Sequence, residues 1–116
     1  MATVLCTGAD AGLVQTRVWI LRQAGHTAVG TMSEDQIVAA CADYRFDVAV
    51  IGQALSPTQK RCVLTVIREQ CPTAKVLELY SVSTGRVLPD ADDWLDVPAS
   101  IPEHLPEKVS ALAAGA

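Results

Sequence analysis

The sequence predicts a single α/β domain, residues 1–116, in which helices cover both faces of an open parallel sheet. Short apolar runs alternate with longer runs of helical spacing along the whole chain, and this alternation is typical of parallel sheets. Residues 46–51 are apolar apart from Asp47, as expected for a strand that is buried on both faces. A chain of 116 residues also has the length of one domain.

The chain is expected to begin with a strand, a helix and a second strand. Residues 3–7 form a short β-branched run followed by Gly8, which indicates a strand. Asp10 is expected to cap the start of a helix, and Gly25 is expected to close it. Residues 27–31 predict the second strand.

Two further helices carry clear signals at their N-termini. Ser33–Gln36 is a capping-box pattern, and it opens a helix that is expected to end near Tyr44. Ser56–Gln59 repeats this pattern after the third strand, with Pro57 at the favoured first helical position. That helix is expected to stop before Pro72.

The last third of the chain predicts two strands and a helix. Residues 75–80 predict the fourth strand, and residues 93–97, which Pro98 stops, predict the fifth. A final helix is expected within residues 102–114. Its regular part is expected only after Pro106, because proline disrupts a helix interior.

The charge balance excludes two classes of partner. Thirteen acidic residues oppose nine lysines and arginines, which gives a formal net charge of −4. Nucleic acids and anionic membranes are bound by clustered basic residues, and the sequence has no such cluster. The longest uncharged run, residues 48–59, is shorter than the roughly 20 residues of a membrane-spanning helix.

The cysteines and histidines argue against a metal site or a disulfide scaffold. No Cys-x-x-Cys pair occurs, and the two histidines stand far apart. We therefore expect reduced, buried or half-buried thiols in a cytoplasmic protein, since the N-terminus also lacks the basic region of a secretory signal. Both histidines are expected on the solvated surface. The residues concerned are Cys6, Cys41, Cys62, Cys71, His26 and His104.

Four segments of the chain match a known family in the right order. They are Val4–Cys6, Ala24–His26, Phe46–Ile51 and Ala91–Pro98. Together they resemble the receiver domains of bacterial two-component response regulators, and Ala91–Pro98 is similar to the family's Gly-Ala-Asp-Asp-Tyr-Leu-x-Lys-Pro stretch. The resemblance covers nearly the whole chain. It implies a flavodoxin-like, doubly wound sheet of five parallel strands in the order 2-1-3-4-5.

The resemblance also implies where the family's phosphorylation chemistry would lie. Receiver domains bind a divalent cation with two acids after strand one and accept a phosphoryl group on an aspartate that ends strand three. A Thr or Ser ends strand four, and a lysine ends strand five. The corresponding residues of this chain are Gly8, Ala9, Gly52, Tyr80 and Val97. The chain therefore resembles a degenerate receiver domain that lacks the phosphoacceptor.

The replaced residues predict that no phosphoryl transfer takes place. Glycine has no nucleophilic oxygen, so an acyl phosphate cannot form at Gly52. Mg²⁺ needs oxygen ligands, which the side chains of Gly8 and Ala9 do not supply. Asp10 could enter the pocket only through a one-residue slip of the loop, and we expect it to cap the helix instead. We therefore expect no enzyme activity, no cofactor and no Mg²⁺ site.

The connection between strands four and five, residues 81–92, is short and contains Gly85 and Pro89. We expect the family's fourth helix to be shortened or absent there, which would uncover part of the sheet. An uncovered aromatic patch tends to be an interface. The alternative is that the connection folds back and buries the aromatic rings of Tyr80 and Trp94. The candidate interaction surface consists of Tyr80, Val87, Leu88 and Trp94.

The first helix offers a competing surface, because apolar residues occupy more of it than one buried stripe requires. Its extra apolar residues are expected to touch the last helix, and a second partner contact is the alternative. Trp19 is expected on a third side of this helix, away from its two apolar sides.

Two functions remain open at this stage. The first is a phosphorylation-independent, receiver-like module that binds a protein partner in bacterial signal transduction, with a second copy of the chain as one candidate partner. The second is a small-ligand sensor, because Gly8, Ala9 and Gly52 vacate space at the carboxyl ends of strands one and three.

Overall fold

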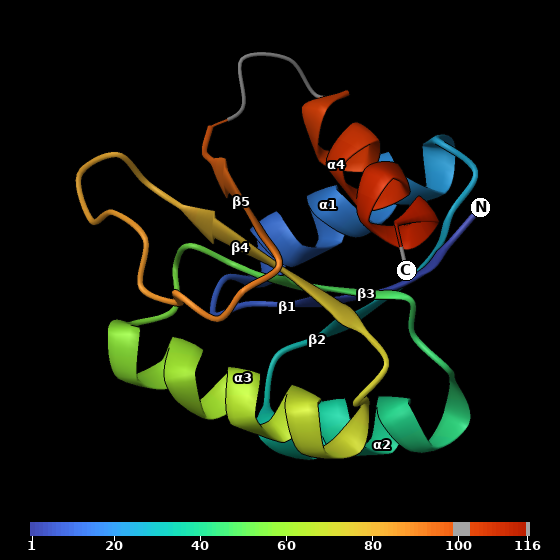
Figure 1. Ribbon diagram of the computed structural model, residues 1–116, viewed down its shortest axis with the longest axis horizontal. Helices are drawn as coiled ribbons and strands as arrows, with labels where there is room; N and C mark the ends of the chain where they lie inside the picture. The colour runs from blue at the N-terminus through green and yellow to red at the C-terminus, as the bar shows by residue number, and fades with distance from the viewer. Residues whose placement is uncertain (99–102, 116) are drawn as a thin grey trace.

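A computed structural model describes residues 1–98 and 103–115 and confirms the predicted α/β architecture (Figure 1). Five strands pair in parallel in the order β2-β1-β3-β4-β5. Helices α1 and α4 lie on one face of this sheet, and α2 and α3 lie on the other (Figure 1). Within the described residues, no helix is long and apolar enough to cross a membrane.

The observed elements follow the predicted ones to within one or two residues at most ends, the usual uncertainty of such bounds. The strands are β1 (Thr3–Thr7), β2 (Thr27–Thr31), β3 (Val48–Ile51), β4 (Lys75–Tyr80) and β5 (Asp93–Asp96). The helices are α1 (Ala11–Gln23), α2 (Glu34–Asp43), α3 (Pro57–Gln70) and α4 (His104–Ala114).

The predicted caps are present and explain where the helices start and stop. The Asp10 carboxylate accepts a hydrogen bond from the N–H of Leu13 at 3.1 Å. Ser56 and Gln59 form the reciprocal capping box, with distances of 3.1 and 2.9 Å. Gly25 follows α1 with a φ of 93°, a left-handed conformation that glycine adopts without strain.

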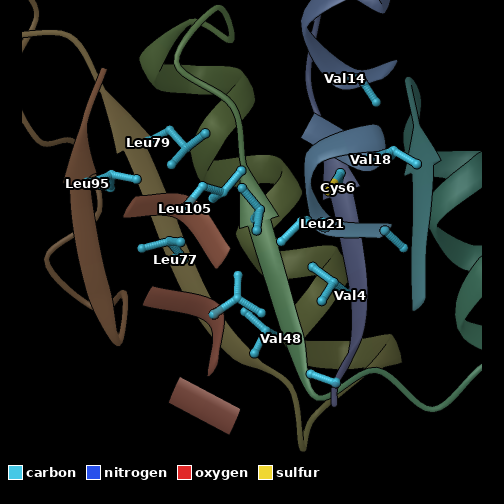
Figure 2. Packing of buried hydrophobic residues seen from close by; sticks show 14 residues of the cluster. Val4, Cys6, Val14, Val18, Leu21, Val48, Leu77, Leu79, Leu95 and Leu105 are labelled. Atoms are coloured by element: carbon cyan, nitrogen blue, oxygen red, sulfur yellow. The ribbon is translucent and has the colours of Figure 1, made fainter. Parts of the chain in front are cut away.

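The core consists of two apolar layers, one on each face of the sheet. Alternation along β1 directs Val4 and Cys6 to one layer and Leu5 to the other. Figure 2 shows the layer beneath α1 and α4. This layer includes Val14, Val18, Leu21, Leu77, Leu79, Leu95 and Leu105. Helices α1 and α4 are in contact, as expected from the wide apolar surface of α1, whereas Trp19 remains 63% exposed.

The helix that the resembled family has between its fourth and fifth strands is absent from this chain between β4 and β5. Residues 81–92, all of which the structure describes, contain turns and no helix. The chain instead runs out from β4 and folds back toward β5 (Figure 1).

The expectation for Pro106 is wrong, because α4 begins before it, at His104. Pro106 occupies the first turn of the helix, where a backbone N–H has no acceptor within the helix, so its missing N–H costs little. Residue 102, where the predicted range begins, lies outside the described residues.

The expectation of four reduced thiols is also wrong. A disulfide joins Cys41 of α2 to Cys71 at the end of α3, two residues that are separated by 30 positions in the sequence. Cys6 is a buried free cysteine, and Cys62 is an exposed one. Because disulfides are rare in the cytosol, the cysteines no longer support the expected cytoplasmic location.

Candidate functional site

The residues matched to the acidic pocket meet at the carboxyl edge of the sheet. Gly8 and Ala9 follow β1, and Gly52 follows β3. The Gly52 N–H donates to the Thr7 carbonyl at 2.8 Å, which places the two glycines side by side. A Cβ on Gly52 would lie only 3.3 Å from the Gly8 Cα. The missing side chains therefore allow the two backbones to approach closely.

Tyr80 and Val97 lie at the same edge, at the ends of β4 and β5. The Val97 N–H donates to the Tyr80 carbonyl at 2.8 Å, and both side chains are half-buried. None of the five predicted positions carries a carboxylate or an amine.

The side chain of Arg17, which sequence reasoning missed, occupies the space beside Gly52. It comes from α1, and it is only 9% exposed. Its Nη1 atom would lie 3.2 Å from a Cβ on Gly52, and its Nη2 atom donates to Oε1 of Gln53. A larger residue at position 52 would therefore crowd the guanidinium.

Arg17 gives this edge of the sheet a positive centre. In the part of the chain that the structure describes, no carboxylate lies within ion-pair distance of the guanidinium. Burial lowers the pKa of Arg17, and the nearby Cys6 and Asp10 oppose this shift. The group nevertheless stays charged at neutral pH, because an arginine side chain does not lose its proton in proteins.

The buried Arg17 guanidinium makes this edge of the sheet unsuited to a divalent cation. The Asp10 carboxylate is engaged as the cap of α1. Over residues 1–98 and 103–115, no group of three or more His, Cys, Asp or Glu residues is placed to hold a metal ion. Like charges repel more strongly where water is excluded, so Arg17 favours an anion at this site.

The buried Cys6 thiol is not an activated nucleophile. Burial raises its pKa to about 12, although Arg17 and Arg22 act in the opposite direction. A nucleophilic cysteine needs a lowered pKa. Cys6 therefore belongs to the apolar layer beneath α1.

The prediction that both histidines lie on the solvated surface is wrong for His26. The residue is only 8% exposed. Nδ1 accepts the N–H of Ala2 at 3.0 Å, and Nε2 lies 3.2 Å from the Ser110 hydroxyl. Burial is the main cause of a lowered His26 pKa. This histidine ties the start of the chain to α4 and is far from the carboxyl edge. His104, at the start of α4, is half-buried.

A buried ion pair fixes the connection that replaces the fourth helix. Glu78 and Lys60 are 0% and 2% exposed, and their charged groups lie 2.8 Å apart. Glu78 also accepts the N–H groups of Val87, at 2.9 Å, and Leu88, at 2.8 Å. Lys60 donates in addition to the Leu79 carbonyl at 2.8 Å. The path of residues 86–88 is thus held from inside the protein.

The candidate interaction surface is only partly available. Leu88 is 1% exposed, so its assignment to the surface is wrong in this conformation, because the connection folds back over the sheet. Tyr80, Val87 and Trp94 are half-buried. The Trp94 indole N–H donates to the Leu88 carbonyl at 3.0 Å.

Arg86 covers both aromatic rings from the solvent side. Its guanidinium carbon lies 5.5 Å from the centre of the Tyr80 ring and 4.7 Å from that of Trp94, within the range of a cation–π interaction. The exposed surface at this place is therefore a preformed cluster of two rings under one cation.

No protein-family model matches the chain, and a comparison with curated protein sequences found no match. Solved structures show a clear likeness. NtrX from Brucella abortus, in a complex with ATP, superposes with a TM-score of 0.80 at 17% identity over 98% of this chain. The chain spans only 27% of the length of NtrX.

Separate receiver domains match over nearly their whole length. The receiver domain of the Francisella response regulator 1452 gives a TM-score of 0.79 at 18% identity, with 99% of this chain and 98% of that one covered. The chemotaxis protein CheY4 of Vibrio cholerae gives 0.78 at 21% identity, with 97% and 98% covered. At these identities the likeness establishes the fold. The chain has the receiver-domain fold of two-component signalling proteins.

Proposed function

We propose that this chain is a degenerate receiver domain that binds a protein partner in bacterial signal transduction without being phosphorylated. The observation that carries this proposal is the set of residues at the carboxyl edge of the sheet, where a receiver domain has its phosphorylation pocket. Gly52 stands at the position matched to the phosphoacceptor, and the buried guanidinium of Arg17 lies beside it. This arrangement provides neither a nucleophilic oxygen nor ligands for Mg²⁺.

The direct test is incubation with acetyl phosphate and Mg²⁺, followed by intact-mass measurement. We expect no phosphoryl adduct on this chain, while a receiver domain that carries the acceptor aspartate is labelled in parallel. An adduct that maps to any aspartate of this chain would overturn the proposal.

The surface around Arg86 is the proposed partner contact. Its supporting observation is the set of contacts that holds it, because Glu78 accepts hydrogen bonds from the neighbouring backbone and Arg86 lies over two rings. A preformed surface loses little conformational entropy on binding.

Affinity capture from the source organism tests this contact. We expect one specific complex that survives EDTA and acetyl phosphate. Arg86→Glu should abolish the complex, and Arg61→Glu, on the exposed part of α3, should preserve it. Equal loss in both variants would contradict a contact at Arg86. A sedimentation measurement distinguishes a second copy of the chain from a different protein.

A small-ligand sensor is the second candidate, and one observation favours it. A cavity of about 270 Å³ lies near this edge of the sheet; Arg17, Gln53 and Val97 line part of it, whereas Gly8, Ala9 and Gly52 do not.

A further inference from the structure

A cavity lies between α1, the ends of β4 and β5, and α4. Its volume is about 270 Å³. Most of its lining is apolar, with Leu13 and Ile20 from α1, Leu95 and Val97 from the β5 region, and Leu105 from α4. Such a cavity is just smaller than the range of roughly 300–1,000 Å³ that is usual for drug-sized ligands.

Among the lining residues that the structure describes, three polar side chains interrupt the apolar surface, and only Arg17 is charged. The Thr16 hydroxyl is already bonded to the Gly12 carbonyl at 2.8 Å. Gln53 accepts a bond from Arg17. A guanidinium has five N–H groups, and the bond to Gln53 uses only one of them. Within residues 1–98 and 103–115, Gln53 is the one hydrogen-bond acceptor of the Arg17 side chain, so the described part of the cavity combines apolar walls with a buried cation that has spare donors.

Burying a charge that has no ion-pair partner is costly. Among the described residues Asp10 acts on Arg17 only from beyond ion-pair distance, and an anion in the cavity would offset the remaining cost. Arg17 would bind a negatively charged group of a ligand, and the apolar walls would bind a hydrocarbon part of the same ligand. We propose that this cavity binds a small apolar monocarboxylate, with the carboxylate on Arg17 and the hydrocarbon part against Leu13, Leu95 and Leu105. This inference rests on the second candidate function.

The geometry of the groups selects a carboxylate. A planar guanidinium can bind both oxygens of a carboxylate in parallel hydrogen bonds. A phosphate dianion would bring two charges to a site with a single cation, and the apolar walls could not replace its lost hydration. The volume limits the ligand to about the size of a substituted benzoate or a medium-chain acid.

Binding is tested on the full chain by calorimetry and by ¹H–¹⁵N NMR, with benzoate, phenylacetate and hexanoate as probes. We expect at least one acid to bind saturably and to shift the signals of Leu13, Arg17 and Leu95. Benzamide or benzyl alcohol, which keep the apolar part without the charge, should bind at least tenfold more weakly. Benzylamine should not bind.

Two variants separate the roles of charge and space. Arg17→Met should weaken binding of the acid at least tenfold and remove the preference over benzamide. Leu95→Trp should fill the cavity and abolish binding while leaving Arg17 in place. Arg61→Met, on the exposed part of α3, is the matched control and should bind as the original chain does. Circular dichroism confirms that each variant is folded.

The inference fails if no acid binds saturably, if benzamide binds as tightly as benzoate, or if Arg17→Met leaves the affinity unchanged. None of these results bears on the partner complex at Arg86. Its persistence in Arg17→Met would leave the proposed interaction module intact.

Discussion

Glu78 is the buried side chain that holds the connection between β4 and β5 at Val87 and Leu88. The substitution Glu78→Gln keeps the size of the side chain and removes its charge. The Lys60 ammonium is then buried without a counter-ion, and an amide NH₂ faces groups that are themselves donors. The Leu79 carbonyl still accepts from Lys60 at 2.8 Å, and one side-chain oxygen remains for the backbone.

Removing one partner of a buried pair costs about 3–5 kcal/mol, and we expect the lower end, about 3 kcal/mol, because these acceptors remain. The entropy of unfolding is about 2.1 cal/mol/K per residue. For a chain of 116 residues, dividing the expected loss of about 3 kcal/mol by the total entropy gives a fall in Tm of about 12 °C. Urea titration and thermal unfolding followed by circular dichroism measure both quantities.

Lys60→Met combined with Glu78→Gln is the control, because the ammonium is then absent. This double variant should be more stable than Glu78→Gln alone. A fall in Tm of less than about 3 °C for Glu78→Gln, or a double variant that is less stable than the single one, would refute the account of the buried pair.

Three further predictions concern stability. Reduction of the Cys41–Cys71 disulfide should lower the free energy of unfolding by about 3.5 kcal/mol, from the entropy of a 30-residue loop, and a shift in the urea midpoint with reductant measures this. Burial lowers the folded-state pKa of His26, so the folded protein binds this proton less readily than the unfolded chain does. The contribution of neutral His26 to the free energy of unfolding is therefore complete above pH 6.5 and declines as the pH falls through the folded-state pKa. Protonation turns the Nδ1 acceptor into a donor that faces the Ala2 N–H. His26→Asn should flatten this part of the stability–pH curve, and an unchanged curve would contradict the assignment. Millimolar Mg²⁺ should leave Tm unchanged, whereas a rise of several degrees would contradict the absence of a cation site.

Local signals predicted the elements well, because each depends on neighbours in the sequence. The Ser56–Gln59 capping box and the left-handed Gly25 need only a few adjacent residues to form. For the connection between β4 and β5, its short length, Gly85 and Pro89 predicted that the helix of the resembled family would be shortened or absent, and residues 81–92 contain no helix. The strand order came from the family resemblance, and the structure confirms it.

The features that define the candidate site depend on residues far apart in the sequence. Arg17 is unremarkable in a helix, and its burial becomes visible only when Gly52 is placed beside it. The partners of the disulfide are brought together by the packing of α2 against α3. One signal was available and missed. Lys60 shares the buried stripe of α3 with Val63 and Ile67, and Glu78 interrupts the apolar run of β4, a pattern that predicts a buried ion pair.

The close approach of Gly8 and Gly52 has a consequence for protein engineering. A Cβ at position 52 would meet the Thr7 carbonyl oxygen at 3.0 Å and the Arg17 guanidinium at 3.2 Å. An aspartate introduced at this position alone would be crowded by the backbone and would pair with the arginine instead of a metal ion. Installing a phosphorylation site here would thus require several substitutions made together, with Arg17 among the positions to change.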